Sequence, residues 1–155
     1  MTAHGTPLES DGACVILFTE NKVLLQKRDS RPPRDADKWA IFGGRFEPGE
    51  TPVAAVCREL QDELGYELTP AELEPLGRFR VPRETRWCLV HYFKAPLNRD
   101  LWQILVGLGR ARSLEREGDG IALFSHDEVD YLRLRCEDRV ALERHFQGRA
   151  FGFEN

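Results

Sequence analysis

Apolar residues occur in short runs separated by polar stretches, and the first runs predict β-structure. Residues 13–18 (ACVILF) and 22–28 (KVLLQKR) are β-rich and enclose Thr19-Glu20-Asn21, which indicates a hairpin. Residues 39–44 (WAIFGG) predict a short strand that runs into glycines. Between them, residues 29–38 contain two prolines and many charges, so we expect an exposed loop.

The best-marked helix is predicted at residues 52–64. Thr51 is a favourable N-cap, Pro52 suits the first helical position, and Gly65 suits the residue just past the end. Apolar side chains recur at helical spacing and form one stripe that we expect to face the core, namely Val53, Val56, Cys57, Leu60 and Leu64.

The rest of the chain alternates predicted strands with two later helices. Residues 76–81, 86–95 and 121–124 are strand-like, while residues 96–113 fit either a short helix or an extra strand. Ser125 and Glu128 form a capping-box pattern that opens a helix, and residues 135–146 predict the last one. Strands on both sides of a central helix favour an α+β fold, an α/β/α sandwich with a mixed β-sheet.

Composition limits the class of protein. The 155 residues suit one compact domain, which we place at residues 12–155 after a flexible leader at residues 1–11. The net charge of −4 gives no positive field for a nucleic-acid polymer or an anionic membrane. The four cysteines form no C-x-x-C pair, and no signal peptide or spanning segment is evident, so we expect a protein of the reducing cytoplasm.

The predicted helix at residues 52–64 carries three carboxylates on one face. Glu59, Asp62 and Glu63 stand at i, i+3 and i+4, where like charges repel and the helix dipole disfavours them. A hard cation such as Mg²⁺ or Mn²⁺ would reconcile the pattern, because it prefers carboxylate oxygens. A solvated acidic face is the alternative, and the helix alone does not decide between the two.

The segment from Gly44 to Tyr66 resembles the signature of the MutT-like Nudix hydrolase family, G-x5-E-x7-R-E-U-x-E-E-x-G-U, where U is a bulky aliphatic residue. Two positions depart from it: Asp62 stands for a glutamate and Tyr66 for an aliphatic residue. Weaker likeness extends over residues 12 to 146. The matching residues are Gly44, Glu50, Arg58, Glu59, Leu60, Glu63 and Gly65.

The resemblance implies a Nudix-type fold and Mg²⁺- or Mn²⁺-dependent hydrolysis of a diphosphate linkage in a nucleoside diphosphate joined to another moiety. It implies metal ligands at Glu59, Asp62 and Glu63, with the Gly43 carbonyl as a further ligand. Gly44, Glu50, Arg58 and Gly65 would support this structure, and Arg58 would pair with Glu50. Glu59, Glu63 and Glu117 are the candidate catalytic carboxylates. Glu117 comes from a later glycine-containing loop, where a solvated charge is nearly as good an interpretation.

Weaker candidates carry stronger structural alternatives. Arg28, beside Lys27, could bind a phosphate, but a basic residue at the end of a strand is more often simply exposed. Trp39 or Phe42 could stack on a base, but aromatic residues beside a strand are more often in the core. Packing is the better interpretation for His91, and His126 has no partner at catalytic spacing. Arg78, Arg80, Arg83 and Arg86 could bind phosphate or balance nearby glutamates, and the second is favoured.

The expected partner is a small nucleotide-type substrate, and a homodimer stays open. The alternative function is a Nudix module that senses a nucleotide without cutting it, because Asp62 is one methylene shorter than the family's glutamate.

Overall fold

The computed structural model describes residues 10–27, 38–82, 86–98 and 120–148. Within them, seven strands form one mixed sheet, in which β1 pairs in parallel with β6 and every other pairing is antiparallel. The central order is β3-β2-β1-β6-β5, with β4 paired to β1 and β7 to β2. The strands are β1 (Ser10–Thr19), β2 (Lys22–Lys27), β3 (Trp39–Ala40), β4 (Phe42–Arg45), β5 (Glu74–Pro82), β6 (Trp87–Pro96) and β7 (Gly120–Ser125).

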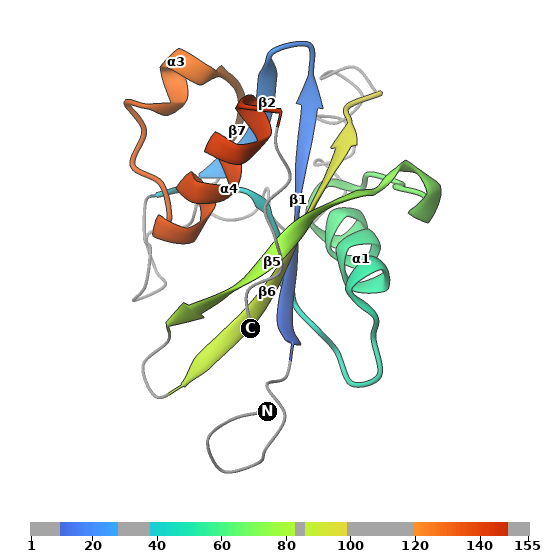
Figure 1. Ribbon diagram of the computed structural model, residues 1–155. Helices are drawn as coiled ribbons and strands as arrows, with labels where there is room; N and C mark the ends of the chain where they lie inside the picture. Colours follow the sequence, from blue (N-terminus) through green and yellow to red (C-terminus); the bar gives the residue numbers. More distant parts are fainter. Residues whose placement is uncertain (1–9, 28–37, 83–85, 99–119, 149–155) are drawn as a thin grey trace.

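Helices cover both faces of this sheet. In Figure 1, α1 (Pro52–Leu64) lies on one side, and α3 (His126–Val129) and α4 (Cys136–Phe146) lie on the other. Because successive side chains of a strand point to opposite faces, β1 contributes to two cores. Val15 and Leu17 pack with α1, whereas Cys14 and Ile16 pack with the helices of the opposite layer. The predicted α/β/α sandwich with a mixed sheet is confirmed.

The strand prediction at residues 39–44 needs a correction. Two strands replace the expected one: β3 pairs with β2, β4 pairs with β1, and Ile41 stands between them outside both. The chain therefore changes its strand partner at Ile41. The first hairpin is as predicted, with Glu20-Asn21 as its turn and Glu20 at a φ of 49°.

The helix predictions hold with small changes at the ends. Residues 52–64 and the last helix match closely, although Arg135 is the N-cap of α4 rather than its first residue. The capping box at Ser125 and Glu128 is present, but the helix it opens has only four residues. A short 3-10 helix at Pro70–Glu72 was not predicted. Of residues 96–113, only 96–98 are described.

A buried polar cluster anchors the point where β3 gives way to β4. Asp138, on α4, is 0 % exposed, and its Oδ2 accepts the Ile41 N–H at 3.0 Å and Arg135 Nε at 2.8 Å. Its Oδ1 accepts the Tyr92 hydroxyl at 3.1 Å. Burial raises the pKa of Asp138, and the Arg135 guanidinium opposes this rise. Asp138 thus fixes the backbone between the two strands.

The division into a leader at 1–11 and one domain at 12–155 stays a prediction. Among the helices of the described residues, none combines the length and the apolar character needed to cross a bilayer.

Candidate active site

The start and end of α1 are determined by its own sequence. The Thr51 hydroxyl accepts the Ala54 N–H at 3.1 Å, and Pro52 occupies the first turn. Gly65 adopts left-handed geometry at φ 64° and ψ 24°, which glycine tolerates better than other residues, and its N–H bonds Gln61 at 3.0 Å. On the inner face, Val56, Leu60 and Leu64 are buried. This packing fixes which face of α1 carries the carboxylates.

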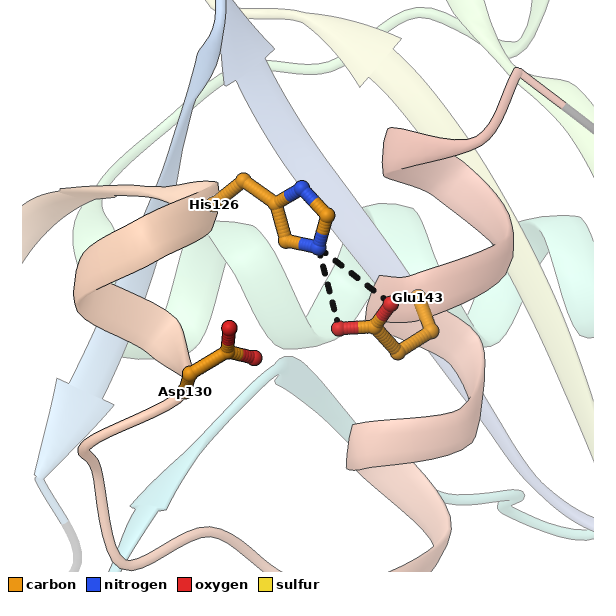
Figure 2. Close-up of side chains that lie close together, drawn as sticks. All are labelled: His126, Asp130 and Glu143. Atoms are coloured by element: carbon orange, nitrogen blue, oxygen red, sulfur yellow. Dashed lines mark hydrogen bonds and ion pairs between the residues drawn. The ribbon is translucent and has the colours of Figure 1, made fainter.

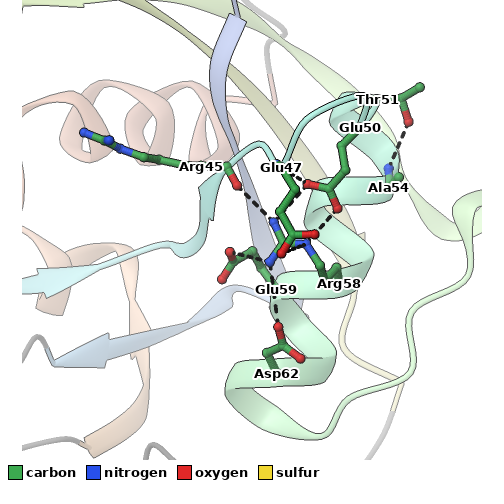
Figure 3. Close-up of polar contacts among 8 residues, drawn as sticks. All are labelled: Arg45, Glu47, Glu50, Thr51, Ala54, Arg58, Glu59 and Asp62. Carbon is green, nitrogen blue, oxygen red and sulfur yellow. Dashed lines mark hydrogen bonds and ion pairs between the residues drawn. The ribbon is translucent and has the colours of Figure 1, made fainter.

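Arg58 binds the loop that precedes α1 against the helix (Figure 3). Its Nε donates to Glu50 Oε2 at 2.7 Å and its Nη2 donates to Glu50 Oε1 at 2.9 Å, which is a bidentate pair. Nη2 also donates to the Arg45 carbonyl at 3.0 Å, and Glu50 accepts the Glu47 N–H at 2.7 Å. The whole Gly44 to Glu50 turn is therefore held by one guanidinium and one carboxylate.

The same guanidinium faces the acidic side of α1. Nη1 donates to Glu59 Oε1 at 2.9 Å and lies 3.7 Å from Asp62 Oδ2. The hydrogen bond from Arg58 holds the pKa of Glu50 below its usual range, and the bond to Glu50 raises the pKa of Arg58. Both groups stay charged at neutral pH, and Arg58 offsets part of the repulsion among the carboxylates.

Two glycines bring the backbone close to this acidic face. A Cβ on Gly44 would lie 2.5 Å from Glu59 Oε1, and one on Gly43 would lie 2.7 Å from Cys14 Cα. Any side chain at Gly44 would push Glu59 away, and any at Gly43 would push β4 off β1. The close approach of β4 to β1 therefore requires glycine at position 43, whereas a side chain at position 44 would displace the Glu59 carboxylate.

The three carboxylates differ in their exposure. The Glu59 side chain is 18 % exposed and that of Asp62 54 %. Glu63 is half-buried, and its Oε2 lies inside the protein. Arg58 contacts only Oε1 of Glu59, so Oε2 has no donor among the described residues. Carboxylate oxygens are the ligands that a hard divalent cation prefers. The described group whose ligand atoms lie within 4.8 Å of one another is a different one, His126, Asp130 and Glu143.

The predicted substrate contacts are only partly visible. Phe42 is 1 % exposed and packs in the core beneath α1, which is the packing role rather than the stacking role. Trp39 is partly buried, with its ring set edge-on to Phe124 at 4.8 Å. Arg28 and Glu117 lie outside the described residues, so both stay predictions.

The remaining candidates lie away from α1 or pack into the structure. His91 is half-buried on β6, and burial lowers its pKa, as expected for a packed histidine. Arg80 lies over the ring of Trp87 at 5.5 Å, near the end of the β5–β6 pair. Arg83 lies outside the described residues.

His126 has a partner that the sequence spacing did not reveal. Its Nε2 lies 3.1 and 3.2 Å from the two carboxylate oxygens of Glu143 on α4, and Asp130 is close by (Figure 2). The signal is faint in the sequence, because His126 and Glu143 stand 17 residues apart on different helices. This group lies on the side of the sheet opposite α1 (Figure 1).

Comparison with known proteins assigns the class that this fold and site define. The profile of the NUDIX domain family matches residues 9–144, and the chain belongs to this family. The match includes every described strand and α1, with its preceding loop.

Individual relatives give the same result. An 8-oxo-dGTP diphosphatase of Escherichia coli is 30 % identical over 103 residues, which cover 60 % of this chain and 78 % of that protein. A CTP pyrophosphohydrolase of Escherichia coli is 39 % identical over 57 residues, covering 37 % of this chain and 42 % of the relative. The chain thus spans less than half the length of this second relative.

Solved structures share the fold. A MutT NUDIX hydrolase from Burkholderia pseudomallei aligns with a TM-score of 0.69 at 23 % identity, over 87 % of this chain and 97 % of its own. The NUDIX domain of Shewanella oneidensis NrtR, solved with ADP ribose, aligns with a TM-score of 0.66 at 17 % identity, over 96 % and 93 %.

Proposed function

We propose that this protein is a Nudix hydrolase that uses water to cleave a diphosphate linkage in a nucleoside diphosphate joined to another moiety. The observation that carries the proposal is the Arg58 clamp. One guanidinium holds Glu50 of the loop in a bidentate pair and contacts Glu59 and Asp62 of α1. A solvated acidic face would not need such a clamp, nor a glycine pressed against Glu59.

We assign the binding of Mg²⁺ or Mn²⁺ to Glu59, Asp62, Glu63 and the carbonyl of Gly43. Oε2 of Glu59, which accepts no hydrogen bond within the described residues, fits this assignment. Such a cation, when bound, supplies charge neutralisation for the diphosphate and acidifies water. Asp62 is the most exposed of the three, and its shorter side chain would still allow it to hold the cation through one of the waters that Mg²⁺ commonly keeps.

The chain's own residues then have separate tasks. Arg58 and Glu50 are positioning residues, because they hold the loop and set the position of Glu59. A carboxylate, Glu59, Glu63 or Glu117, accepts the proton of the attacking water, while the bond between phosphorus and the bridging oxygen breaks. The products are two phosphorylated fragments, so one water is consumed for each linkage cut.

A substrate panel tests this function. The panel holds 8-oxo-dGTP and CTP, because relatives are named for them, and ADP-ribose, because a fold neighbour binds it. We expect turnover of at least one compound with Mg²⁺ or Mn²⁺, with products identified by phosphorus NMR, and loss of turnover in excess chelator. Full activity in chelator, or cleavage at a phosphoester rather than at the diphosphate, would contradict the proposal.

A second candidate is a non-hydrolysing nucleotide sensor. Asp62 favours it, because a shorter carboxylate weakens the three-carboxylate set. Nucleotide binding by calorimetry without turnover on any member of the panel would support the sensor.

A further inference from the structure

A second group of metal-ligating side chains lies on the layer opposite α1. His126 is the first residue of α3, and Asp130 is the residue that caps its end, so the two stand at i and i+4 on one helical face. Glu143 reaches them from α4. One ligand atom of each, namely His126 Nε2 and one oxygen from each carboxylate, can be chosen so that all lie within 4.8 Å of one another.

From this arrangement we propose that His126, Asp130 and Glu143 form a surface site for a transition-metal dication of the Zn²⁺ class, separate from the cation of the Nudix helix. The donor set decides the class. Mg²⁺ favours oxygen-only sites, whereas an imidazole nitrogen with two carboxylates suits Zn²⁺ and its neighbours. Three protein ligands also leave a fourth position open to solvent.

The distances fit this class. Two ligands at about 2.0 Å from a tetrahedral zinc ion are roughly 3.3 Å apart. His126 Nε2 already lies 3.1 and 3.2 Å from the Glu143 oxygens. The Asp130 carboxylate, within 4.8 Å, would need to move by at most about 1.5 Å to reach the same spacing. Asp130 is exposed and its carboxylate makes no hydrogen bond within the described residues, so the movement of the side chain breaks none there.

The imidazole is oriented before an ion arrives. Its ring stacks on Phe146 with centroids 4.6 Å apart and planes 10° from parallel. Phe146 follows Glu143 by one turn on α4, so one helix supplies both a ligand and the support for the other ligand's ring. The capping box of Ser125 and Glu128 fixes the start of α3, and with it the backbone of His126. Outer contacts of this kind tune metal affinity in known sites.

Charge gives a further reason. Glu143 and Asp130 place two carboxylates within the group, and the ion pairs of the described residues put no lysine or arginine on either. A divalent cation neutralises both. It would also link α3 to α4, so binding should stabilise the folded chain.

Co²⁺ absorption is the direct test, because tetrahedral Co²⁺ has visible bands and takes the ligands of zinc. The protein used for this test is the full chain with the substitutions Glu59→Gln and Glu63→Gln. These remove two carboxylates from α1 and leave the opposite layer intact. We expect one equivalent of Co²⁺ to bind with tetrahedral bands, Zn²⁺ to displace it, and Zn²⁺ to raise the melting temperature.

Variants in the same background assign the ligands. His126→Gln and Asp130→Asn should each raise the dissociation constant for Co²⁺ by about tenfold or more. Asp127→Asn is the matched control, since it removes an exposed carboxylate from the same short helix but not from the group, and it should bind as before. His126→Gln also loses the contact to Glu143, whereas Asp130→Asn tests the site without disturbing that pair.

The proposal is overturned if no Co²⁺ binds, or if Asp130→Asn and Asp127→Asn bind equally well. His126 and Glu143 are then a hydrogen-bonded pair only. Neither result bears on the proposed hydrolase, because the substrate panel uses the wild-type chain and another layer of the protein.

Discussion

The layer that contains α1 and the layer that contains α4 both depend on buried or half-buried charges, but the two are built on different scales. On the α1 side, Arg58 and Glu50 are eight residues apart, and Arg58 and Glu59 are neighbours. On the α4 side, Asp138 bonds the backbone of Ile41 across 97 residues and Tyr92 across 46. The first arrangement is local and holds the loop that precedes α1, and the second is long-range and holds the backbone between β3 and β4.

This difference predicts how each layer responds to substitution. Each of the three carboxylates of α1, Glu59, Asp62 and Glu63, can be removed with little loss of stability, because like charges stand beside it on the helix. Asp138, in the α4 layer, is fully buried, so its loss leaves its hydrogen-bond partners without a protein or water contact in its place. Activity should therefore be sensitive in one layer and stability in the other.

The largest effect is expected for Glu63→Gln. The substitution keeps the size of the side chain and removes a proposed metal ligand, so kcat should fall by about 10³-fold. Loss of the repulsion between Glu59 and Glu63 should raise the unfolding free energy by a few tenths of a kcal/mol in metal-free buffer. Kinetics on the best substrate and thermal unfolding in chelator measure the two quantities.

Glu67→Gln is the control for that variant, since Glu67 is an exposed glutamate just beyond α1. It should leave both quantities unchanged. If Glu63→Gln were as active as Glu67→Gln, Glu63 would be a surface charge with no role in hydrolysis.

The second effect belongs to the α4 layer. Asp138→Ala removes the acceptor of three hydrogen bonds and leaves Arg135, whose side chain is 16 % exposed, without its partner. We expect the unfolding free energy to fall by about 3–5 kcal/mol, the range for breaking a buried pair. Chemical denaturation of this variant and of Asp127→Ala, an exposed control on the same layer, would measure it.

A loss for Asp138→Ala no larger than that for Asp127→Ala would mean that the buried cluster does not hold the β3–β4 junction. If Asp138→Ala unfolded like the wild type but had a much lower kcat, the expectation that the α4 layer affects stability rather than activity would be wrong.

The two layers also differ in how far the sequence could predict them. The α1 layer was predictable because its signals are contiguous: Thr51 and Gly65 bound the helix, and the signature places Arg58 at a set distance from Glu50. The Asp138 cluster was not, because nothing near Asp138 in the sequence indicates that its carboxylate replaces a strand partner for Ile41. The single strand expected at residues 39–44 was wrong for the same reason. His126 and Glu143 meet only through the packing of α3 on α4.

A smaller effect is expected from pH. Burial lowers the pKa of His145 to about 4, and Lys94 adds to the shift. The unfolded chain takes up this proton near the ordinary value of about 6.5, whereas the folded chain resists it until the pH is near 4. Proton uptake therefore stabilises the unfolded state relative to the folded state as the pH falls through this window. We expect the free energy of unfolding to fall by about 1 kcal/mol between pH 7 and pH 5, a value discounted for the partial exposure of His145.

His145→Phe keeps a ring against Phe18 and Phe146 and removes the titration. Its unfolding free energy should change less between pH 7 and pH 5 than that of the wild type. An identical slope in both proteins would place the pH dependence on other groups, with His91 the next to test, since its pKa is lowered in the same direction.

The smallest effect is expected for Asp62→Glu, which restores the residue of the family signature. Asp62 is exposed and lies one turn from Glu59 and 3.7 Å from Arg58, so its carboxylate is already at the acidic face. If Asp62 holds the proposed cation through a water, the longer side chain would contact the ion directly, and we expect the Mg²⁺ concentration for half-maximal rate to change by about threefold or less. Titration of Mg²⁺ against rate for both proteins measures this.

The same pair of proteins separates the hydrolase from the sensor. A hydrolase with a functional Asp62 predicts activity in both, with a small shift in the Mg²⁺ curve. A sensor disabled by its shorter carboxylate predicts an inactive wild type and an active Asp62→Glu variant. The second result would assign nucleotide binding rather than hydrolysis to the α1 layer. The contact of Arg58 with Glu50 would then support a site that binds a nucleotide without hydrolysing it.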